Sequence, residues 1–437
     1  MKLKGDRTLL IFWATVMLVL FRPELHGFDT VAYYSWLRSA VIRGTLDVTE
    51  TFAHYGYLGE RGFAPTGYRL NEWPVGPAIL WLPFFLTGHL MALVANVLGL
   101  AIPADGFSPP YLALTALGSS LYGLGGLILL RRLMLTVAGP DSAFWAVLGI
   151  WLASPLVFYM SAHPFMAHAP DFFLNTLFLW LWVRARGSAW RRRLGLGLVG
   201  GLAASVRYQN ATLLLWPALE DLTRVRQGLR HSLVPLGVLA IGTVFGFLPQ
   251  LVVWRVVFGD WLVPNPYGVT GAGSFDLRSP HLLGVLFSTD RGLLPWMPLS
   301  ALGLWGLAGP LLRHPALARI VGAQFLAQVY IVGSWSSWSG GAAFGPRLLV
   351  GLLPGLGLGL AALYEGWIRR GRTAAVACCT LAFVAWNLIL LARYGLGDVP
   401  HAGPISPEHF WLGQLAFLVQ LPGRLGILVD GLLRRGP

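Results

Sequence analysis

Residues 8–21 form an uninterrupted apolar run, TLLIFWATVMLVLF. Lys2, Lys4 and Arg7 precede this run, and the polar residues 22–24 (RPE) follow it. A basic segment before an apolar run resembles a signal peptide, but the small-x-small pattern of a cleavage site is missing here. We therefore expect an uncleaved first transmembrane helix. The positive charge before it predicts a cytoplasmic N-terminus.

Apolar stretches of this kind recur along all 437 residues. Hydrophobic residues make up 55% of the chain and charged residues 12%, about half of the roughly 25% that is typical of soluble domains. No polar interval is long enough for a separate soluble domain. Because a full crossing needs about 20 residues, we predict an all-α polytopic membrane protein with roughly 11 to 14 crossings. Residues 1–437 are expected to form a single transmembrane domain.

The further apolar stretches share a length close to one crossing, and several are short or interrupted. They cover residues 75–101, 111–130, 142–162, 165–183, 194–220, 232–257, 293–312, 316–334, 348–368, 374–392 and 409–421. Two of them are ambiguous. Residues 75–101 form either one helix, for which charge alternation would place Arg131 and Arg132 outside, or two short helices that meet near Gly88, which would place them inside. Residues 194–220 have a polar break at 207–210. Breaks at membrane depth are tolerated where they are buried in protein or line a wet cavity.

The net charge of +13 is distributed as short arginine clusters between the apolar stretches. This is the positive-inside pattern of cytoplasmic loops, so we expect membrane lipids and no nucleic acid as partners. The clusters lie at residues 131–132, 184–193, 224–230, 369–372 and 434–435. Charge alternation then places four loops on the outer side. They are residues 22–73 (the first extracytoplasmic loop), 161–168, 258–292 (the second large extracytoplasmic loop) and 335–347.

The first outer loop contains a segment that reads as a short helix from about residue 28 to Arg43, ended by Gly44. On this helix Asp29, Tyr33 and Trp36 fall at i, i+4 and i+7, so a carboxylate and two aromatic rings share one side. This combination suits a sugar, which has polar edges and apolar C–H faces. The alternative is that Asp29 caps the helix and that the rings belong to the membrane interface.

Further polar residues lie where outer loops enter the membrane. Glu72 belongs to the sequence NEWPVGP at residues 71–77, which also fits a simple Pro/Gly-rich helix start. His163, His168 and Asp171 lie in the outer loop and the beginning of the next apolar stretch. An ionisable residue near membrane depth is a functional hypothesis by default. For each histidine a satisfied interfacial position is the alternative, whereas Asp171 has the stronger claim.

Two arginines are candidate ligands for a phosphate. Arg207 precedes Tyr208 inside an apolar stretch, and Arg347 follows Trp338 in a glycine-rich loop. Arginine can hold a phosphate with two parallel hydrogen bonds. The alternative is that each arginine extends to the interface while its aliphatic stem stays in the membrane.

The order of these features resembles the GT-C superfamily of membrane glycosyltransferases. It is most similar to bacterial relatives of protein O-mannosyltransferases and of aminoarabinose transferases. The features that carry the resemblance are the first helix with its long outer loop, the early Asp29 before paired aromatics, the sequence NEWPVGP, the outer His/Asp segment, the intramembrane Arg207, the sequence STDRGLLPW at 288–296, and residues 338–347. Family members often have Asp-Glu or Asp-Asp in the first loop, whereas here Thr30 follows Asp29.

The resemblance implies an inverting glycosyltransferase of the bacterial-type cytoplasmic (inner) membrane, with its active face outside. It would move a sugar from a polyprenyl-phosphate-linked donor to a hydroxyl of an acceptor that the sequence does not identify. It implies Asp29 as the base, Asp171 as a second catalytic carboxylate, and Arg207 and Arg347 as phosphate ligands. The substrate-binding set would be Tyr33, Trp36, Glu72, His163, His168, Arg207, Tyr208, Trp338 and Arg347.

No cofactor is expected. The sequence has no Asp-x-Asp motif, and the adjacent Cys378 and Cys379 have no metal-ligand spacing. Metal use differs within the family, so a divalent metal is the alternative.

Two other function classes compete with transfer. The first is a secondary transporter or a flippase for lipid-linked sugars, because such proteins also use broken helices and intramembrane arginines. Transporters often show internal repeats, and we find none. The second is a non-catalytic partner in envelope assembly.

Overall fold

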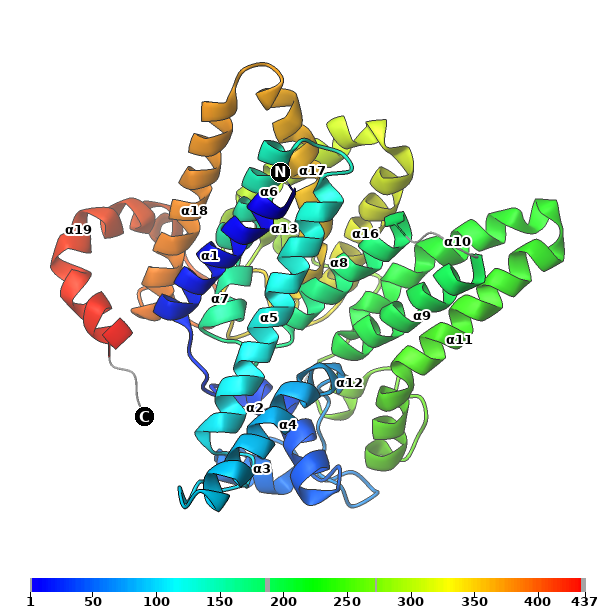
Figure 1. Cartoon of the computed structure of the whole chain (residues 1–437), viewed down its shortest axis with the longest axis vertical. Coiled ribbons are helices and arrows are strands. Elements are labelled where there is room, and N and C mark those ends of the chain that lie inside the picture. The colour runs from blue at the N-terminus through cyan, green and yellow to red at the C-terminus, as the bar shows by residue number, and fades with distance from the viewer. Residues whose placement is uncertain (1, 185–188, 272, 434–437) are drawn as a thin grey trace. The chain divides into compact units, whose positions relative to one another are not determined.

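The computed structural model of the chain describes residues 2–184, 189–271 and 273–433. Within them the fold is helical (Figure 1), and the only β-structure is two isolated bridges, Phe63 with Arg69 and Phe275 with Trp335. The prediction of an all-α polytopic membrane protein is confirmed. Six helical spans of the described residues are long and apolar enough to cross a bilayer: Gly76–Val97, Pro109–Met134, Leu229–Phe258, Pro315–Ser334, Arg347–Ile368 and Thr373–Gly395. The crossing number of 11 to 14 stays a prediction.

The chain divides into two compact units. Unit 1 comprises residues 1–21, 127–161 and 275–437, and unit 2 comprises residues 22–126 and 162–274. The single transmembrane domain expected for residues 1–437 stays a prediction. The predicted arginine cluster at 434–435 lies outside the described residues, as do residues 185–188 of the cluster at 184–193.

Helix α17 is the buried centre of unit 1: nearly all of its residues are buried, and α6, α15, α16 and α18 contact it. The α-helices are α1 (Lys2–Leu20), α6 (Pro140–Leu152), α7 (Leu156–Ser161), α13 (Leu282–Phe287), α14 (Leu293–Trp296), α15 (Leu299–Ala308), α16 (Pro315–Gly333), α17 (Leu353–Ile368), α18 (Thr373–Gly395) and α19 (Pro407–Leu433). Two 3₁₀ turns, Pro310–Arg313 and Arg347–Leu352, complete the unit.

Unit 2 contains the first outer loop and a helical hairpin. Its α-helices are α2 (Phe28–Arg38), α3 (Thr49–His54), α4 (Gly76–Val97), the first part of α5 (Pro109–Met134), α8 (His168–Arg184), α9 (Ala189–Val206), α10 (Leu215–Thr223), α11 (Leu229–Val253) and α12 (Pro266–Val269). Shorter helical turns of other types are Ser39–Arg43, Tyr208–Leu214, Arg224–Gln227 and Trp254–Phe258.

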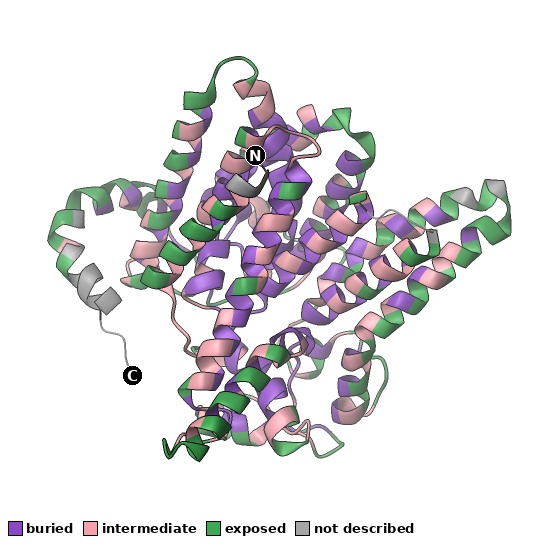
Figure 2. Ribbon diagram, in the orientation of Figure 1, coloured by how far each residue is buried: buried purple, intermediate pink, exposed green. Residues whose placement is uncertain are grey.

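Helices α9 and α11 run side by side (Figure 1) and meet through glycines. A Cβ atom on Gly201 would lie 2.3 Å from the carbonyl oxygen of Thr243, and one on Gly246 would lie 2.2 Å from that of Leu198. The two backbones are therefore in direct contact, which only glycine permits. The rest of α11 is largely exposed (Figure 2), and only 22% of its most apolar window is buried, so most of its surface is available to lipid.

The predicted break in residues 194–220 is confirmed. Helix α9 ends at Val206, Arg207 has an extended backbone (φ −149°, ψ 121°), and a 3₁₀ turn begins at Tyr208. The side chain of Asn210 donates to the Ala203 carbonyl across the break at 3.0 Å. The same carbonyl also accepts from the backbone N–H of Arg207 at 3.0 Å, so two hydrogen bonds meet on it at the break.

The ambiguity in residues 75–101 is decided in favour of one helix. Helix α4 is continuous and contains Pro83. In unit 1 the Nη1 of Arg131 donates to Asp6 at 2.9 Å, and Arg132 bonds the same carboxylate at 3.0 Å. These arginines, near the end of α5, therefore lie beside the beginning of α1, on the side of the N-terminus.

The helix predicted in the first outer loop is also confirmed. Helix α2 continues into a π-helical turn that ends at Arg43, and Gly44 follows in the left-handed conformation at φ 64°. The N-cap position is Gly27, and Asp29 lies in the first helical turn. The alternative that Asp29 caps this helix is therefore wrong. A carboxylate in the first turn still interacts favourably with the helix dipole.

Candidate functional site

Asp29, Tyr33 and Trp36 lie on one face of α2, and this face runs from Asp29 at the beginning of the helix into the core of unit 2. Asp29 is half-buried, whereas Tyr33 and Trp36 are almost fully buried. The indole nitrogen of Trp36 donates to the carbonyl of Trp73 at 2.9 Å. Trp36 therefore packs the first loop together, and Asp29 is the member of this face that solvent or a substrate can reach.

Glu72 is a fully buried carboxylate with one cationic partner. The Nε of Arg61 donates to its two oxygens at 2.8 and 3.0 Å, and the guanidinium lies over the rings of Phe28 and Trp73. Burial raises the pKa of Glu72, and the hydrogen bonds from Arg61 oppose this shift. Sequence reasoning did not identify Arg61. The signal for it was the general rule that a buried carboxylate needs a partner.

Asp171 is held at the beginning of α8 by two amide groups. Its Oδ1 accepts from the Nδ2 atoms of Asn175 and Asn210, each at 2.7 Å. Asn210 belongs to the break after α9, so this carboxylate ties the break to α8. The other oxygen, Oδ2, is buried and has no hydrogen-bond partner among the residues that the structure describes.

Arg207 projects from the break toward the same helix. Its Nη1 donates to the Nδ1 of His168 at 3.2 Å, which requires His168 to carry its proton on Nε2 when the ring is neutral. The guanidinium also lies close enough to Asp171 to interact with its charge. Its Nε is a buried donor without a hydrogen-bond partner in the described part of the chain.

Tyr208 and Tyr267 join Arg207 to the first loop. The Tyr208 hydroxyl donates to the backbone carbonyl of Glu72 at 3.3 Å, and its ring lies 6.1 Å from that of Tyr267. Desolvation raises the pKa of Tyr267, and the nearby Tyr33 and Tyr208 raise it further, whereas Arg207 lowers it. Charged and phenolic groups from four segments of unit 2 thus gather in one place.

We call this group the Arg207 cluster. It consists of Tyr33, Glu72, His168, Asp171, Arg207, Tyr208 and Tyr267. Six of its seven members were candidates from the sequence. Tyr267 was not ranked, because loop 258–292 contains many polar residues and no pattern among them. His163, another candidate, lies half-buried in the turn before α8.

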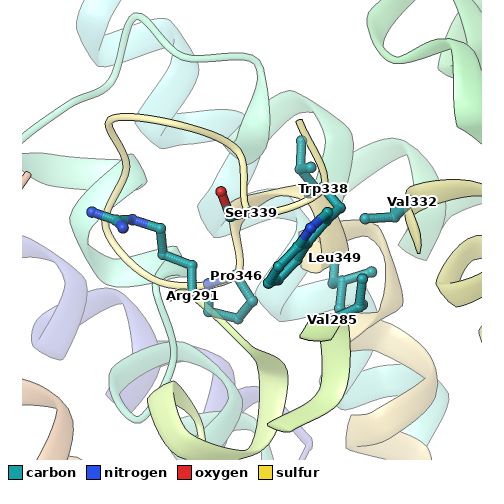
Figure 3. Close-up of a pocket in the computed structure, with 8 residues that line it drawn as sticks. Val285, Arg291, Val332, Trp338, Ser339, Pro346 and Leu349 are labelled. Atoms are coloured by element: carbon teal, nitrogen blue, oxygen red, sulfur yellow. The ribbon is translucent and has the colours of Figure 1, made fainter. Parts of the chain in front are cut away.

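Trp338 and Arg347, the two candidates of unit 1, lie near each other. A Cβ atom on Gly340 would come within 3.2 Å of the Arg347 Nε, so the arginine side chain packs on this glycine. Trp338 stacks on His281 and lines a cavity of about 10 Å³, together with Ser339 and Pro346 (Figure 3). That volume is enough for about one water molecule, so the cavity itself holds no sugar.

Arg291 borders the same cavity, but its guanidinium points away from the Trp338 ring (Figure 3). It donates to three backbone carbonyls, those of Ala343 (3.0 Å), Pro400 (3.0 Å) and Gly403 (2.8 Å), and it pairs with Asp290. Arg291 is also the only non-glycine residue with positive φ in the described ranges, at 63°. This conformation is costly for arginine, and the four contacts maintain it.

The described residues contain no group of three His, Cys, Asp or Glu side chains that could hold a metal ion. Whether the protein uses a metal therefore stays at the level of the sequence prediction. The Arg207 cluster contains a buried arginine donor, Nε of Arg207, and a buried carboxylate acceptor, Oδ2 of Asp171, that have no hydrogen-bond partner among the described residues.

Comparison with known proteins bears on the fold. No protein-family model matches the sequence, and comparison with curated protein sequences gives no match. Among solved structures the chain is similar to ArnT from Cupriavidus metallidurans bound to undecaprenyl phosphate, with a TM-score of 0.53 and 15% identity over 99% of this chain and 73% of ArnT. The chain has the fold of ArnT.

Two further structures are similar to the chain. The apo state of the same ArnT has a TM-score of 0.53 and 16% identity over 99% of this chain and 72% of that chain. The oligosaccharyltransferase AglB from Archaeoglobus fulgidus, in complex with an inhibitory peptide and a dolichol-phosphate, has a TM-score of 0.46 and 11% identity over 99% of this chain and 56% of AglB. The resemblance expected from the sequence is thereby confirmed for the fold, on the strength of ArnT.

Proposed function

We propose that the chain is a glycosyltransferase that moves a sugar from a polyprenyl-phosphate carrier to an acceptor hydroxyl. The reaction would take place on the outer face of a bacterial-type cytoplasmic membrane. The observation that carries this proposal is the state of Arg207. It is a guanidinium placed by a helix break in a membrane protein, with a buried N–H donor that no described residue satisfies.

A phosphate would satisfy that donor. A buried donor without a partner costs free energy, and arginine recognises phosphate oxygens through charge-assisted hydrogen bonds. The donor is expected to be lipid-linked because ArnT, which has the same fold, is bound to undecaprenyl phosphate. In the proposed complex Arg207 stabilises the negative charge that the departing phosphate carries as the glycosidic C–O bond breaks.

The acceptor hydroxyl needs a base, and Asp29 is our candidate. The acceptor oxygen forms the new bond to the anomeric carbon, its proton passes to the Asp29 carboxylate, and the bonding electrons leave with the carrier phosphate. Attack opposite the leaving group inverts the anomeric centre. Asp29 is the half-buried end of the α2 face that also carries Tyr33 of the Arg207 cluster. Asp171 enters the proposal as the carboxylate that neighbours Arg207.

The remaining candidates keep narrower roles. Tyr208, Glu72 and His168 would shape the site around Arg207, and His163 stays a predicted substrate contact. Trp338 and Arg347 belong to unit 1, and their contact with substrate stays a prediction. The sugar, whether mannose or another, and the acceptor are properties that transfer assays would identify.

The test is binding and turnover of a lipid phosphate by the purified protein in nanodiscs. Native mass spectrometry should show retention of undecaprenyl phosphate and not of undecaprenol, which has the same chain without the charge. Undecaprenyl-phosphate-linked sugars should release undecaprenyl phosphate when incubated with the protein and an acceptor extract. Equal retention of both lipids, with no release from any such sugar, would contradict the proposal.

A further inference from the structure

Residues 71–76 connect four segments of unit 2 within six positions. Asn71 is 1% exposed, and its Nδ2 donates to the Ala32 carbonyl at 2.9 Å and to the Ser35 hydroxyl at 3.2 Å. Both acceptors belong to α2, the helix that carries Asp29. At the next position, the Glu72 carbonyl accepts from Tyr208, which follows Arg207. The beginning of this segment therefore contacts the α2 helix and the break.

The end of the segment contacts α11 and α9. The backbone N–H of Val75 donates to the Oε1 of Gln250 at 2.9 Å, and Gln250 is 1% exposed on α11. Gly76 lies directly against the last residues of α9. A Cβ atom on it would lie 2.3 Å from the Ser205 carbonyl oxygen and 2.5 Å from the Val206 nitrogen. No side chain fits there unless the backbone before Arg207 moves.

We propose that residues 71–76 are a positioning joint, which sets the placement of α2 with Asp29 relative to the break with Arg207. Asn71 holds the α2 side, whereas Gly76 and Gln250 hold the break side. The inference rests on the proposed function for its catalytic consequence. The structural part of the proposal is that the conformation of the break depends on the contacts of Gln250 and Gly76, and this part does not need the proposed function.

A simple helix start does not require these contacts. A Pro/Gly-rich N-terminus would need proline at the first turn, but it would need neither a glutamine from another helix nor a glycine against a foreign backbone. The side-chain amide of Asn71 likewise donates to two acceptors on α2, Ala32 and Ser35, and not to α4, which begins at Gly76. Small displacements matter in such a site, because a misplacement of about 1 Å can cost up to ~10²-fold in rate.

The first test removes the contact between α11 and the joint. Gln250→Leu keeps the approximate volume and deletes the acceptor for the Val75 N–H, whereas Gln250→Glu retains an oxygen at the same place. We expect hydrogen exchange at residues 205–212 to be faster in Gln250→Leu and restored in Gln250→Glu. Thr243→Val is the matched control, because Thr243 lies on the same helix and bonds only the Leu239 carbonyl of that helix.

The second test follows the two sides of the joint in kinetics. Gln250→Leu should weaken undecaprenyl phosphate binding and raise KM by about 10-fold, with kcat less affected. Asn71→Asp removes the amide donors to α2 and should lower kcat at an unchanged KM. A general loss of stability would not divide the effects between the two parameters in this way. Gly76→Ala should affect both, and Gln250→Leu serves where that variant does not fold.

The outcomes separate the joint from the proposed function. If hydrogen exchange at residues 205–212 is the same in Gln250→Leu and in the wild type, the proposal of a positioning joint is wrong, whatever the protein binds. If exchange changes but the wild type binds no undecaprenyl phosphate, the joint stands as a structural element and the proposed function fails. If the wild type binds the lipid, and Gln250→Leu binds it equally well despite faster exchange, the positioning role is overturned.

Discussion

Two arginines, the buried Arg291 of unit 1 and the half-buried Arg207 of unit 2, use their guanidinium groups in opposite ways. Arg291 directs its nitrogens at the backbone carbonyls of Ala343, Pro400 and Gly403 and at the carboxylate of Asp290. Arg207 donates to His168, and its Nε has no hydrogen-bond partner among the described residues. The Arg291 guanidinium joins the segments around Ala343 and Pro400 to its own loop, whereas Arg207 retains an Nε donor that a ligand could use.

The difference shows how a structural arginine is distinguished from a ligand-binding one. A buried cation whose donors all reach protein acceptors contributes to the stability of the fold, and removing it leaves several carbonyls unsatisfied. A buried cation with a free donor costs stability until a ligand arrives. Arg291 and Arg207 differ in this respect, because the Arg291 guanidinium reaches three carbonyls and a carboxylate, whereas the Arg207 Nε has no partner among the described residues. Each prediction below tests this distinction or the site to which Arg207 belongs.

The largest effect is expected for Asp29→Asn. Loss of a general base typically lowers the rate by ~10²–10⁴-fold. Asp29 is not the N-cap residue, so stability should fall only by the loss of its charge from the first helical turn, about 0.3–1 kcal/mol. Sugar transfer by the purified variant is the measurement. Asp47→Asn is the control, because Asp47 is in the same loop and its carboxylate accepts from the backbone N–H and the hydroxyl of the neighbouring Thr49. Near-normal transfer by Asp29→Asn would remove it as the base, and Asp171→Asn would be tested next.

Arg291→Gln should act on stability. Breaking a buried ion pair by removing one partner costs about 3–5 kcal/mol, and the three carbonyls lose their donors as well. We expect a clearly lower midpoint of thermal unfolding in detergent, with normal affinity for undecaprenyl phosphate in the folded fraction. A stable Arg291→Gln protein with weakened lipid binding would reverse the roles of the two arginines.

Arg207 substitutions should act on the ligand. Arg207→Gln is expected to weaken undecaprenyl phosphate binding by roughly 10- to 100-fold, or about 1.4–3 kcal/mol, without lowering the unfolding midpoint. Arg207→Lys should restore only part of the affinity, because lysine lacks the planar fork that bonds two phosphate oxygens. Full affinity in Arg207→Lys would indicate a simple charge contact. Unchanged affinity in a folded Arg207→Gln protein would exclude Arg207 from the site.

Glu72 provides a pH-dependent test in the first loop. Burial raises its folded-state pKa above the usual 4.5, so the protonated form is favoured on folding. Its stabilising contribution is full below pH 4.5 and is lost as pH rises through the raised folded-state value. Glu72→Gln stays neutral throughout. The difference in unfolding midpoint, variant minus wild type, should therefore increase as pH rises through this window. A difference that stays constant with pH would contradict the raised pKa of Glu72.

The smallest effect is expected for Arg347→Gln. This arginine is half-buried and packs on Gly340, so solvent would partly screen a contact of its charge with a phosphate. If it contacts the carrier phosphate, undecaprenyl phosphate binding should fall about threefold, or less than 1 kcal/mol. Arg347→Lys, which retains the charge, is the matched variant. Equal affinity in all three proteins would remove Arg347 from the candidate site.

The sequence predicted the features that depend on local chemistry. Apolar length marked the membrane-crossing helices, Gly44 marked the end of the first-loop helix, and the polar residues 207–210 marked the break. Charge alternation predicted less well. It needed residues 75–101 to be divided so that Arg131 would lie inside, whereas α4 is continuous and Arg131 pairs with Asp6. The side of the membrane on which Arg131 lies stays a prediction.

Partners distant in the chain were beyond the sequence. Arg61 and Glu72 are 11 residues apart, and nothing in their spacing indicated that they pair. Tyr267 joins the Arg207 cluster from a loop in which many polar residues looked equivalent. Asn210 was noted only as part of a polar break, but it holds Asp171 and the Ala203 carbonyl. Such roles depend on tertiary contacts, which periodicity does not encode.

The glycine contact between α9 and α11 has a consequence for how the protein is made. Two helices that touch backbone to backbone associate in lipid through close van der Waals packing, without help from a polar core. Residues 189–253 can therefore pair as soon as both helices have left the translocon, before the C-terminal half of the chain is synthesised. The break that carries Arg207 lies between these helices, so its frame would already be assembled when the later helices enter the bilayer. A bulky residue at Gly201 or Gly246 would thus damage biogenesis before it could affect any reaction.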